Sequence, residues 1–233
     1  MASCRSCGAR DVVPAIDVGG TAFSICQSCS SLQHEIGFRP SELEQMDVYR
    51  GVSGYGEFCM KFGQSIFRTM PLIRYIQPGR AFCIEANDGH LGSTWIHRGW
   101  SVDASSLSVI SANRARRVGL RVNVGDPSAA IASFGVKAYD AAFTDNGYTR
   151  FANPIAELRS VASVIRPGAA LLIRGPDPCS KDVLSGSTST LGRLNQTIPS
   201  QAAIMRMAGE SGLVLVDRRD DGPDMTLVLV RIC

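Results

Sequence analysis

From residue 80 onward, segments with the pattern of a β-strand alternate with segments that have the pattern of an α-helix. Short apolar runs bounded by turn residues predict strands, and apolar residues three or four positions apart predict helices. The predicted strands cover residues 81–85, 100–104, 120–124, 139–144 and 169–173, and the predicted helices cover residues 90–98, 107–118, 153–165 and 202–208. This alternation is typical of an α/β domain with a mostly parallel sheet, because parallel neighbours need a helical crossover.

The last part of the chain departs from this alternation. We expect strands at Leu213–Asp217 and Met225–Ile232, joined by residues 218–224. The connection contains Asp-Gly-Pro, which is typical of a turn. So short a connection requires antiparallel pairing, and the sheet should therefore end in an antiparallel strand.

Two further signals concern the segment before that hairpin. Pro167-Gly168 should end the preceding helix, which begins with Asn153 as its cap and Pro154 in its first turn. Residues 175–189 are polar and rich in glycine, proline and serine, so we expect a loop long enough to serve a functional site.

Four cysteines near the start form two C-x2-C pairs, Cys4 with Cys7 and Cys26 with Cys29. This spacing is typical of a zinc ribbon, in which four thiolates surround one Zn²⁺ ion tetrahedrally. Strand-like runs at residues 12–18 and 21–26 supply the hairpin between the pairs. Redox-active dithiols and a chance spacing are the alternatives. A closed four-cysteine site has no open coordination position, so we expect the zinc to be structural.

The chain has 233 residues, enough for one full domain and a small appendage. We expect a zinc ribbon over 1–38, a helical linker or lid over 39–79 and the α/β domain over 80–233. The net charge of +3 argues against an electrostatic grip on nucleic acid or a membrane. The chain shows neither a signal peptide nor an apolar stretch of roughly 18 residues, so we expect a cytoplasmic location.

The segment CIEANDGHLG at residues 83–92, placed after the first predicted strand, resembles the first cofactor loop of class I S-adenosylmethionine-dependent methyltransferases. It is similar to the Asn-Asp-Gly form of that loop in sugar C-methyltransferases, which also carry an N-terminal four-cysteine zinc domain. The resemblance covers residues 80–233 and implies a Rossmann-like methyltransferase sheet and S-adenosylmethionine as cofactor. Relative to that group, we expect a degenerate cofactor motif and no large C-terminal domain.

The resemblance implies that the loop after the first strand contacts the cofactor. A strand that turns into a helix N-terminus presents backbone N–H groups to the methionine carboxylate, and glycine permits close approach. Aligned without a gap, Cys83 replaces the family's acidic residue and Glu85 its first glycine; in a second register Glu85 is the acid that ends the strand. The cofactor-binding candidates in this loop are Glu85, Asn87, Asp88 and Gly89.

Further cofactor candidates follow the later strands. Relatives bind both ribose hydroxyls with an acidic residue at the end of the second strand; the ungapped alignment puts Ser106 there, and Asp103 serves if the strand ends early. Asp126 resembles the residue beside the adenine, or it caps the following helix. Asp145 lies at the end of the fourth strand, where ligands gather in open α/β sheets.

Catalysis has fewer candidates. Methyl transfer from a sulfonium needs in-line positioning and, for an acceptor that must lose a proton, a base. Many relatives carry Glu-His after the fourth strand, whereas this chain has Thr149-Arg150. Tyr148 and His90 are therefore the candidates for the base.

The pattern leads to two hypotheses of function. The first is a methyltransferase that acts on a small molecule, a sugar or a biosynthetic intermediate. The alternative is a catalytically inactive methyltransferase-like subunit that serves as a binding or scaffold partner of another enzyme. Modification of nucleic acid guided by the ribbon is a third hypothesis, and the near-neutral charge argues against it.

Overall fold

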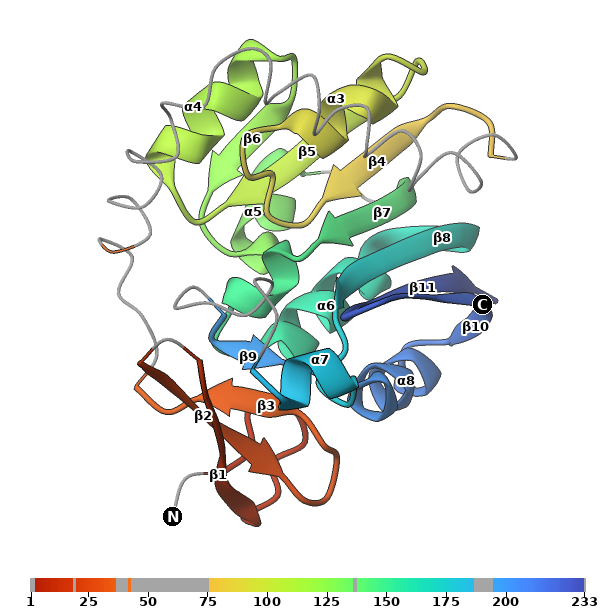
Figure 1. Ribbon diagram of the computed structural model, residues 1–233. Helices are drawn as coiled ribbons and strands as arrows, with labels where there is room; N and C mark the ends of the chain where they lie inside the picture. The colour runs from red at the N-terminus through yellow and green to blue at the C-terminus, as the bar shows by residue number, and fades with distance from the viewer. Residues whose placement is uncertain are drawn as a thin grey trace. The chain divides into compact units, whose positions relative to one another are not determined.

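The computed structural model describes residues 3–18, 20–36, 42, 76–135, 138–186 and 195–232. Two compact units divide the chain: residues 1–38 with 145–233 form the first, and residues 39–144 form the second. The elements of each unit can be followed by label and colour in Figure 1. The predicted helical linker over 39–79 lies outside the described residues, apart from residue 42 and residues 76–79.

Four parallel strands form the sheet of the second unit, in the order β7-β4-β5-β6. They are β4 (Arg80–Cys83), β5 (Ser101–Ser106), β6 (Arg121–Val124) and β7 (Tyr139–Asp145), the last of which ends at the unit boundary. Phe82, at the centre of β4, is fully buried, as expected for a strand covered on both faces.

Helices connect these strands, as the alternating pattern predicts. They are α3 (His90–Ile96), α4 (Val109–Arg117) and α5 (Pro127–Phe134). The hydroxyl of Ser108 accepts a hydrogen bond from the backbone N–H of Ser111 and so caps α4. Three arginines in the last turn of α4 complement the negative end of its dipole.

The first unit contains the antiparallel part of the same sheet. Its strands are β8 (Ile165–Pro176), β10 (Leu213–Asp221) and β11 (Asp224–Arg231), and β11 pairs antiparallel with both others. The complete hydrogen-bonded order is β10-β11-β8-β7-β4-β5-β6. The predicted antiparallel end of the sheet is therefore confirmed, and the turn is tighter than expected because β10 continues to Asp221.

The helices of the first unit begin at side-chain caps. They are α6 (Pro154–Val164), α7 (Lys181–Leu184) and α8 (Gln201–Glu210), and a 3-10 turn, η1 (Gly147–Arg150), precedes α6. Asn153 caps α6 and Pro154 occupies its first turn, as predicted. Within the described residues, no helix is long and apolar enough to cross a membrane.

The helix predicted over residues 153–165 ends at Val164, shortly before Pro167-Gly168, as predicted. The following strand begins earlier than predicted, so that Pro167 and Gly168 lie within β8. β8 pairs with β11 only from Ala170 to Pro176, so Pro167 breaks none of these pairing bonds. The guanidinium of Arg231 donates to the carbonyl oxygens of Ala162, Ser163 and Ile165 and so supplies hydrogen-bond partners at the end of α6. The expectation of an uninterrupted loop at 175–189 is wrong, because residues 175–176 belong to β8 and residues 181–184 form α7. Residues 187–189 lie outside the described residues.

The ribbon residues belong to the first unit, together with residues 145–233. The hairpin forms as predicted from β1 (Val12–Val18) and β2 (Thr21–Cys26). The sheet continues through β3 (Leu32–His34) to β9 (Thr197–Ile198), which the pattern did not predict. A buried apolar cluster joins β2, β3, β9 and α7, and it consists of Phe23, Leu32, Val183 and Ile198.

Candidate functional site

Buried polar side chains gather at the carboxyl ends of β4 and β5. Glu85, just beyond β4, is 1% exposed, and Ser105 and Ser106 are fully buried. The Glu85 carboxylate accepts a hydrogen bond from the backbone N–H of Leu107 at 2.8 Å and one from the Ser106 hydroxyl at 3.3 Å. The Ser105 hydroxyl accepts from the Glu85 N–H at 3.1 Å. The two strand ends are thus tied together by polar groups, at the edge where open α/β sheets bind ligands.

The loop from β4 to α3 has an unusual backbone. Glu85, Asn87 and Gly89 all have positive φ, at 58°, 48° and 83°. The amide of Asn87 donates to the Glu85 carbonyl oxygen at 3.3 Å. β4 ends at Cys83, so Glu85 is the second residue after the strand.

Gly89 serves packing within the protein. A Cβ at this position would lie 2.8 Å from Ala115 Cα and 2.7 Å from Val118 Cγ2, so a larger residue would push α3 away from α4. Close helix packing is therefore a second physical reason for a glycine at this position, besides the expected close approach of the cofactor. α3 has only seven residues, so its dipole is short. The loop backbone and Glu85 are therefore stronger indications of a ligand-binding site than the helix N-terminus.

Asp88 and His90 flank this glycine. Asp88 forms an ion pair with Arg114 of α4, with 3.1 Å between Nη1 and Oδ1, which anchors the loop. His90 is the first residue of α3, and its carbonyl oxygen accepts a hydrogen bond from the Ser93 hydroxyl. Asp88 therefore joins the loop to α4 and does not stand free for a ligand.

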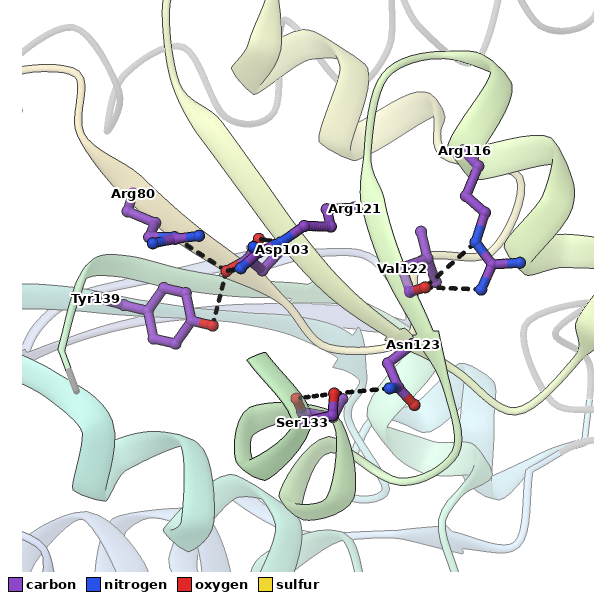
Figure 2. Close-up of polar contacts among 9 residues, drawn as sticks. Arg80, Asp103, Arg116, Arg121, Val122, Asn123, Ser133 and Tyr139 are labelled. Atoms are coloured by element: carbon purple, nitrogen blue, oxygen red, sulfur yellow. Dashed lines mark hydrogen bonds and ion pairs between the residues drawn. The ribbon is translucent and has the colours of Figure 1, made fainter. Parts of the chain in front are cut away.

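Asp103 lies at the other end of the strands. Figure 2 shows its carboxylate between Arg80, Arg121 and Tyr139, which are the first residues of β4, β6 and β7. Arg121 binds it bidentately at 2.7 and 2.8 Å, Arg80 donates at 3.0 Å and the Tyr139 hydroxyl at 2.9 Å. The structure therefore places Asp103 in a cross-strand clamp at the amino ends of the strands and not beside Glu85 and Ser106.

Other polar contacts in Figure 2 secure β6 and its neighbouring helices. Arg116 of α4 donates two hydrogen bonds to the Val122 carbonyl oxygen, and Asn123 donates to the Ser133 hydroxyl of α5. Asp126 occupies the N-cap position of α5, but its side chain makes no capping hydrogen bond and is exposed. Among the described residues no ion pair of Asp126 occurs either, so its carboxylate remains available to a ligand.

The first unit holds a second group of polar side chains, after the end of β7. Arg174 of β8, 7% exposed, lies between Asp145 at 2.6 Å and Asp224 at 2.5 Å. The backbone N–H of Asn146 donates to the Arg174 carbonyl oxygen, and Asn146 has a positive φ of 60°. Arg174 was not among the sequence candidates, because a single arginine within an apolar strand pattern gives no sign of its partners.

Tyr148 is fully buried beside this group. Its ring lies against Gly175, where an added Cβ would come within 2.6 Å of the Tyr148 hydroxyl. Burial raises the pKa of Tyr148 far above its ordinary value, and the nearby carboxylate of Asp224 adds to the effect. A phenol held neutral in this way can donate a hydrogen bond at neutral pH but is poorly suited to remove a proton.

The four ribbon cysteines come together as their spacing predicts. All four sulfurs lie within 4.8 Å of one another, with Cys4 and Cys29 at 3.7 Å and Cys7 and Cys26 at 3.6 Å. A tetrahedral zinc with bonds of about 2.3 Å requires sulfurs about 3.8 Å apart, so the cluster fits the ion. Burial raises the pKa of the Cys4 thiol to about 11, so zinc binding has to displace its proton.

Comparison with known proteins gives the fold. The chain matches no protein-family model and no curated protein sequence. Solved methyltransferase structures match it at low sequence identity. One is the magnesium protoporphyrin IX methyltransferase of Synechocystis PCC 6803 with bound SAH, at 15% identity and a TM-score of 0.58, over 73% of this chain and 83% of that chain.

Two further matches agree. A chain from the complex of the Haloferax volcanii Trm112 methyltransferase activator with its methyltransferase matches at 13% identity and a TM-score of 0.59, over 82% of this chain and 99% of that chain. An O-methyltransferase family protein from Burkholderia thailandensis matches at 15% identity and a TM-score of 0.56, over 73% of this chain but 58% of that chain. The chain therefore has the Rossmann-like fold of class I methyltransferases, as predicted.

Proposed function

We propose that this protein binds S-adenosylmethionine at the carboxyl ends of β4 and β5. The observation that carries this proposal is the buried polar group formed by Glu85, Ser105 and Ser106 at that edge. A buried polar group at this edge of the sheet is expected where a polar ligand is held. Solved structures with the same fold include a methyltransferase with bound SAH, which supports the choice of cofactor.

The described residues suit different parts of the cofactor. The positive-φ loop with Asn87 offers backbone N–H groups to the methionine carboxylate, Glu85 with Ser106 suits the ribose hydroxyls, and the exposed Asp126 suits the adenine. When bound, the cofactor supplies an activated methyl group. Asp103 is left out of this set because three neighbours occupy its carboxylate.

The acceptor we propose is a small molecule, a sugar or biosynthetic intermediate. Within the first unit, the Tyr148 hydroxyl has no hydrogen-bond partner among the described residues, although it is buried. A neutral phenol can orient an acceptor oxygen or nitrogen by donating a hydrogen bond. His90 remains the candidate base.

Binding of S-adenosylmethionine to zinc-loaded protein, measured by calorimetry with S-adenosylhomocysteine as comparison, tests the proposal. We expect saturable binding of both and at least about tenfold weaker binding by Glu85→Gln, because the variant loses a charged acceptor. Glu157→Gln, at a half-buried position of α6, is the matched control and should bind like the unaltered protein. Absence of binding by well-folded protein would refute the proposal. Replacing Gly89 is unsuitable, because any side chain there strikes Ala115.

One observation favours the alternative of a catalytically inactive subunit. Burial raises the pKa of Tyr148 and keeps this phenol neutral, so Tyr148 is poorly suited to act as the base. In that case the protein acts by binding another protein. Methyl transfer to any acceptor by the purified protein, lost in Glu85→Gln and retained in Glu157→Gln, would exclude it. Failure to bind S-adenosylmethionine would turn the search toward protein partners.

We also propose that the four cysteines hold one structural Zn²⁺ ion. Metal analysis should find one zinc for each chain, and Cys7→Ser should lose it. Cys179→Ser, at an exposed cysteine outside the cluster, is the control and should retain the zinc. Zinc in less than stoichiometric amount after refolding with the metal would contradict this assignment.

A further inference from the structure

A pocket of about 460 Å³ lies where the first cysteine knuckle faces α6 and α8. The wall from the knuckle is residues 3–8, and the opposite wall comes from the two helices. All of these residues belong to the first compact unit. A volume of this size is within the range of roughly 300–1,000 Å³ that is typical of small-molecule sites.

The pocket is lined by three arginines and one glutamate. They are Arg5 of the knuckle, Arg159 of α6, and Arg206 and Glu210 of α8. Arg159 and Glu210 form an ion pair at 2.6 Å, in which both side chains are about half exposed. The remaining two arginines give the pocket an excess of positive charge.

These two arginines differ in how they are held. Arg5 donates from Nη1 to the Gln196 carbonyl oxygen at 3.3 Å, and its backbone N–H donates to Gln33 Oε1 at 3.1 Å, so its position is set by the fold. Arg206 is exposed, and it makes no hydrogen bond or ion pair with any described residue. An arginine presents five donors, so both can bind an anion without breaking an existing contact.

The rest of the lining suits an organic body attached to the anion. Ile155, Ala203 and Met207 are buried and apolar, and they also line the pocket. The Ser6 hydroxyl, also in the lining, is buried and has no hydrogen-bond partner among the described residues. A buried hydroxyl without a partner is costly, so a polar ligand group beside it would be stabilising.

A zinc ion bound by the four cysteines would repel an anion in this pocket only weakly. Four thiolates on Zn²⁺ carry a formal charge of about −2. Cys4 is 3% exposed, and the sulfur accepts a hydrogen bond from the Ser6 N–H, so this charge is partly screened from the pocket. The guanidiniums of Arg5 and Arg206 make no hydrogen bond to a described cysteine and can therefore face a ligand.

We propose that this pocket binds a small molecule through an anionic oxygen group, a phosphate monoester or a carboxylate. Arginine is the side chain best suited to such groups because its planar fork donates two parallel hydrogen bonds. The volume exceeds that of a bare phosphate, so the ligand has an organic part of about sugar size. This inference does not depend on methyl transfer.

Calorimetry with the zinc-loaded protein tests it with four probes: ribose 5-phosphate, citrate, inorganic phosphate and ribose. We expect saturable binding of ribose 5-phosphate, weaker binding of phosphate and no binding of ribose. Binding of citrate in place of ribose 5-phosphate would also support an anion site and would identify a carboxylate as the source. If neither organic anion binds, or if ribose binds as tightly as ribose 5-phosphate, the proposal is overturned.

Charge variants separate this site from general attraction. Arg206→Glu should weaken binding at least about tenfold, since a charged hydrogen-bond donor is lost. Arg206→Gln should weaken it less, and it serves if the first variant is unstable. Arg117→Glu, at an exposed arginine of α4, is the matched control and should leave binding unchanged. Equal losses in Arg206→Glu and Arg117→Glu would overturn the proposal.

Discussion

Two buried carboxylates in the second unit, Asp103 and Glu85, have opposite surroundings although both are 1% exposed. Two arginines and a tyrosine from three neighbouring strands surround Asp103. Glu85, beyond the carboxyl end of β4, accepts from a backbone amide and a serine hydroxyl and has a positive φ. One carboxylate clamps the sheet, and the other shapes a strained loop at the edge where open α/β sheets in general bind ligands.

We propose that stability and function are divided between the two ends of this parallel sheet. At the amino ends, Asp103 joins four strands through one charged group, and its hydrogen bond raises the pKa of Arg121. At the carboxyl ends, the buried Glu85 carboxylate accepts hydrogen bonds from the Leu107 N–H and from the Ser106 hydroxyl. Substitutions at the two ends should therefore change different measurements.

The largest expected effect is at the clamp. Asp103→Asn keeps the shape but removes the charge that two arginines and Tyr139 share, so we expect a loss of about 2–4 kcal/mol in the free energy of unfolding. The estimate is below that for a fully buried pair because Arg80 and Arg121 are 37% and 51% exposed. Urea unfolding measures it. Asp220→Asn, at a 60% exposed side chain, should change stability by less than about 1 kcal/mol.

The next effect compares two buried tyrosines. Tyr139→Phe removes a hydroxyl that donates to a carboxylate, and it should cost about 1.5–3 kcal/mol. Tyr148→Phe removes a hydroxyl without a partner among the described residues, and its stability should change by less than about 1 kcal/mol. Urea unfolding of both variants checks this. Equal costs would show that Tyr148 also has a strong partner.

A substitution in the loop between β4 and α3 should weaken S-adenosylmethionine binding more than it lowers the free energy of unfolding. Glu85→Gln should cost only about 1 kcal/mol of stability, since the amide oxygen can still accept from Leu107, while it weakens S-adenosylmethionine binding about tenfold. Calorimetry and urea unfolding of the same preparation provide both numbers. A stability loss as large as that of Asp103→Asn would remove the proposed distinction between the two carboxylates.

The smallest effect is the dependence on alkaline pH. Burial raises the pKa of Tyr139 and Tyr148, and Asp103 and Asp224 respectively add to the shift. Both phenols therefore stay neutral in the folded protein, and their contribution is fully present below the unfolded pKa of about 10 and declines as pH rises above it. We expect stability to fall by up to about 1.4 kcal/mol per pH unit for each tyrosine above pH 10. Replacing either tyrosine by phenylalanine should flatten the decline.

Local patterns predicted much of this molecule from sequence. The ribbon hairpin has the predicted bounds, since the strands at 12–18 and 21–26 are short alternating runs next to a glycine turn. The parallel strands β4 to β7 and the antiparallel β10 and β11 also follow from apolar runs and connection lengths. The cysteine spacing alone predicted the cluster that the structure brings together.

Only the tertiary structure decided which side chains meet. Apolar periodicity shows which residues are buried, but it does not show that Asp103 faces Arg121 while Glu85 reaches Leu107. The pairing of β3 with β9 joins segments more than 160 residues apart, and no local signal carries it. Long-range contacts depend on how strands are ordered in the sheet, and that order is set by packing of the whole chain. For this reason the sequence determined most of the elements and the cysteine cluster, while the positions of the carboxylates and of the arginine-lined pocket came from the tertiary structure alone.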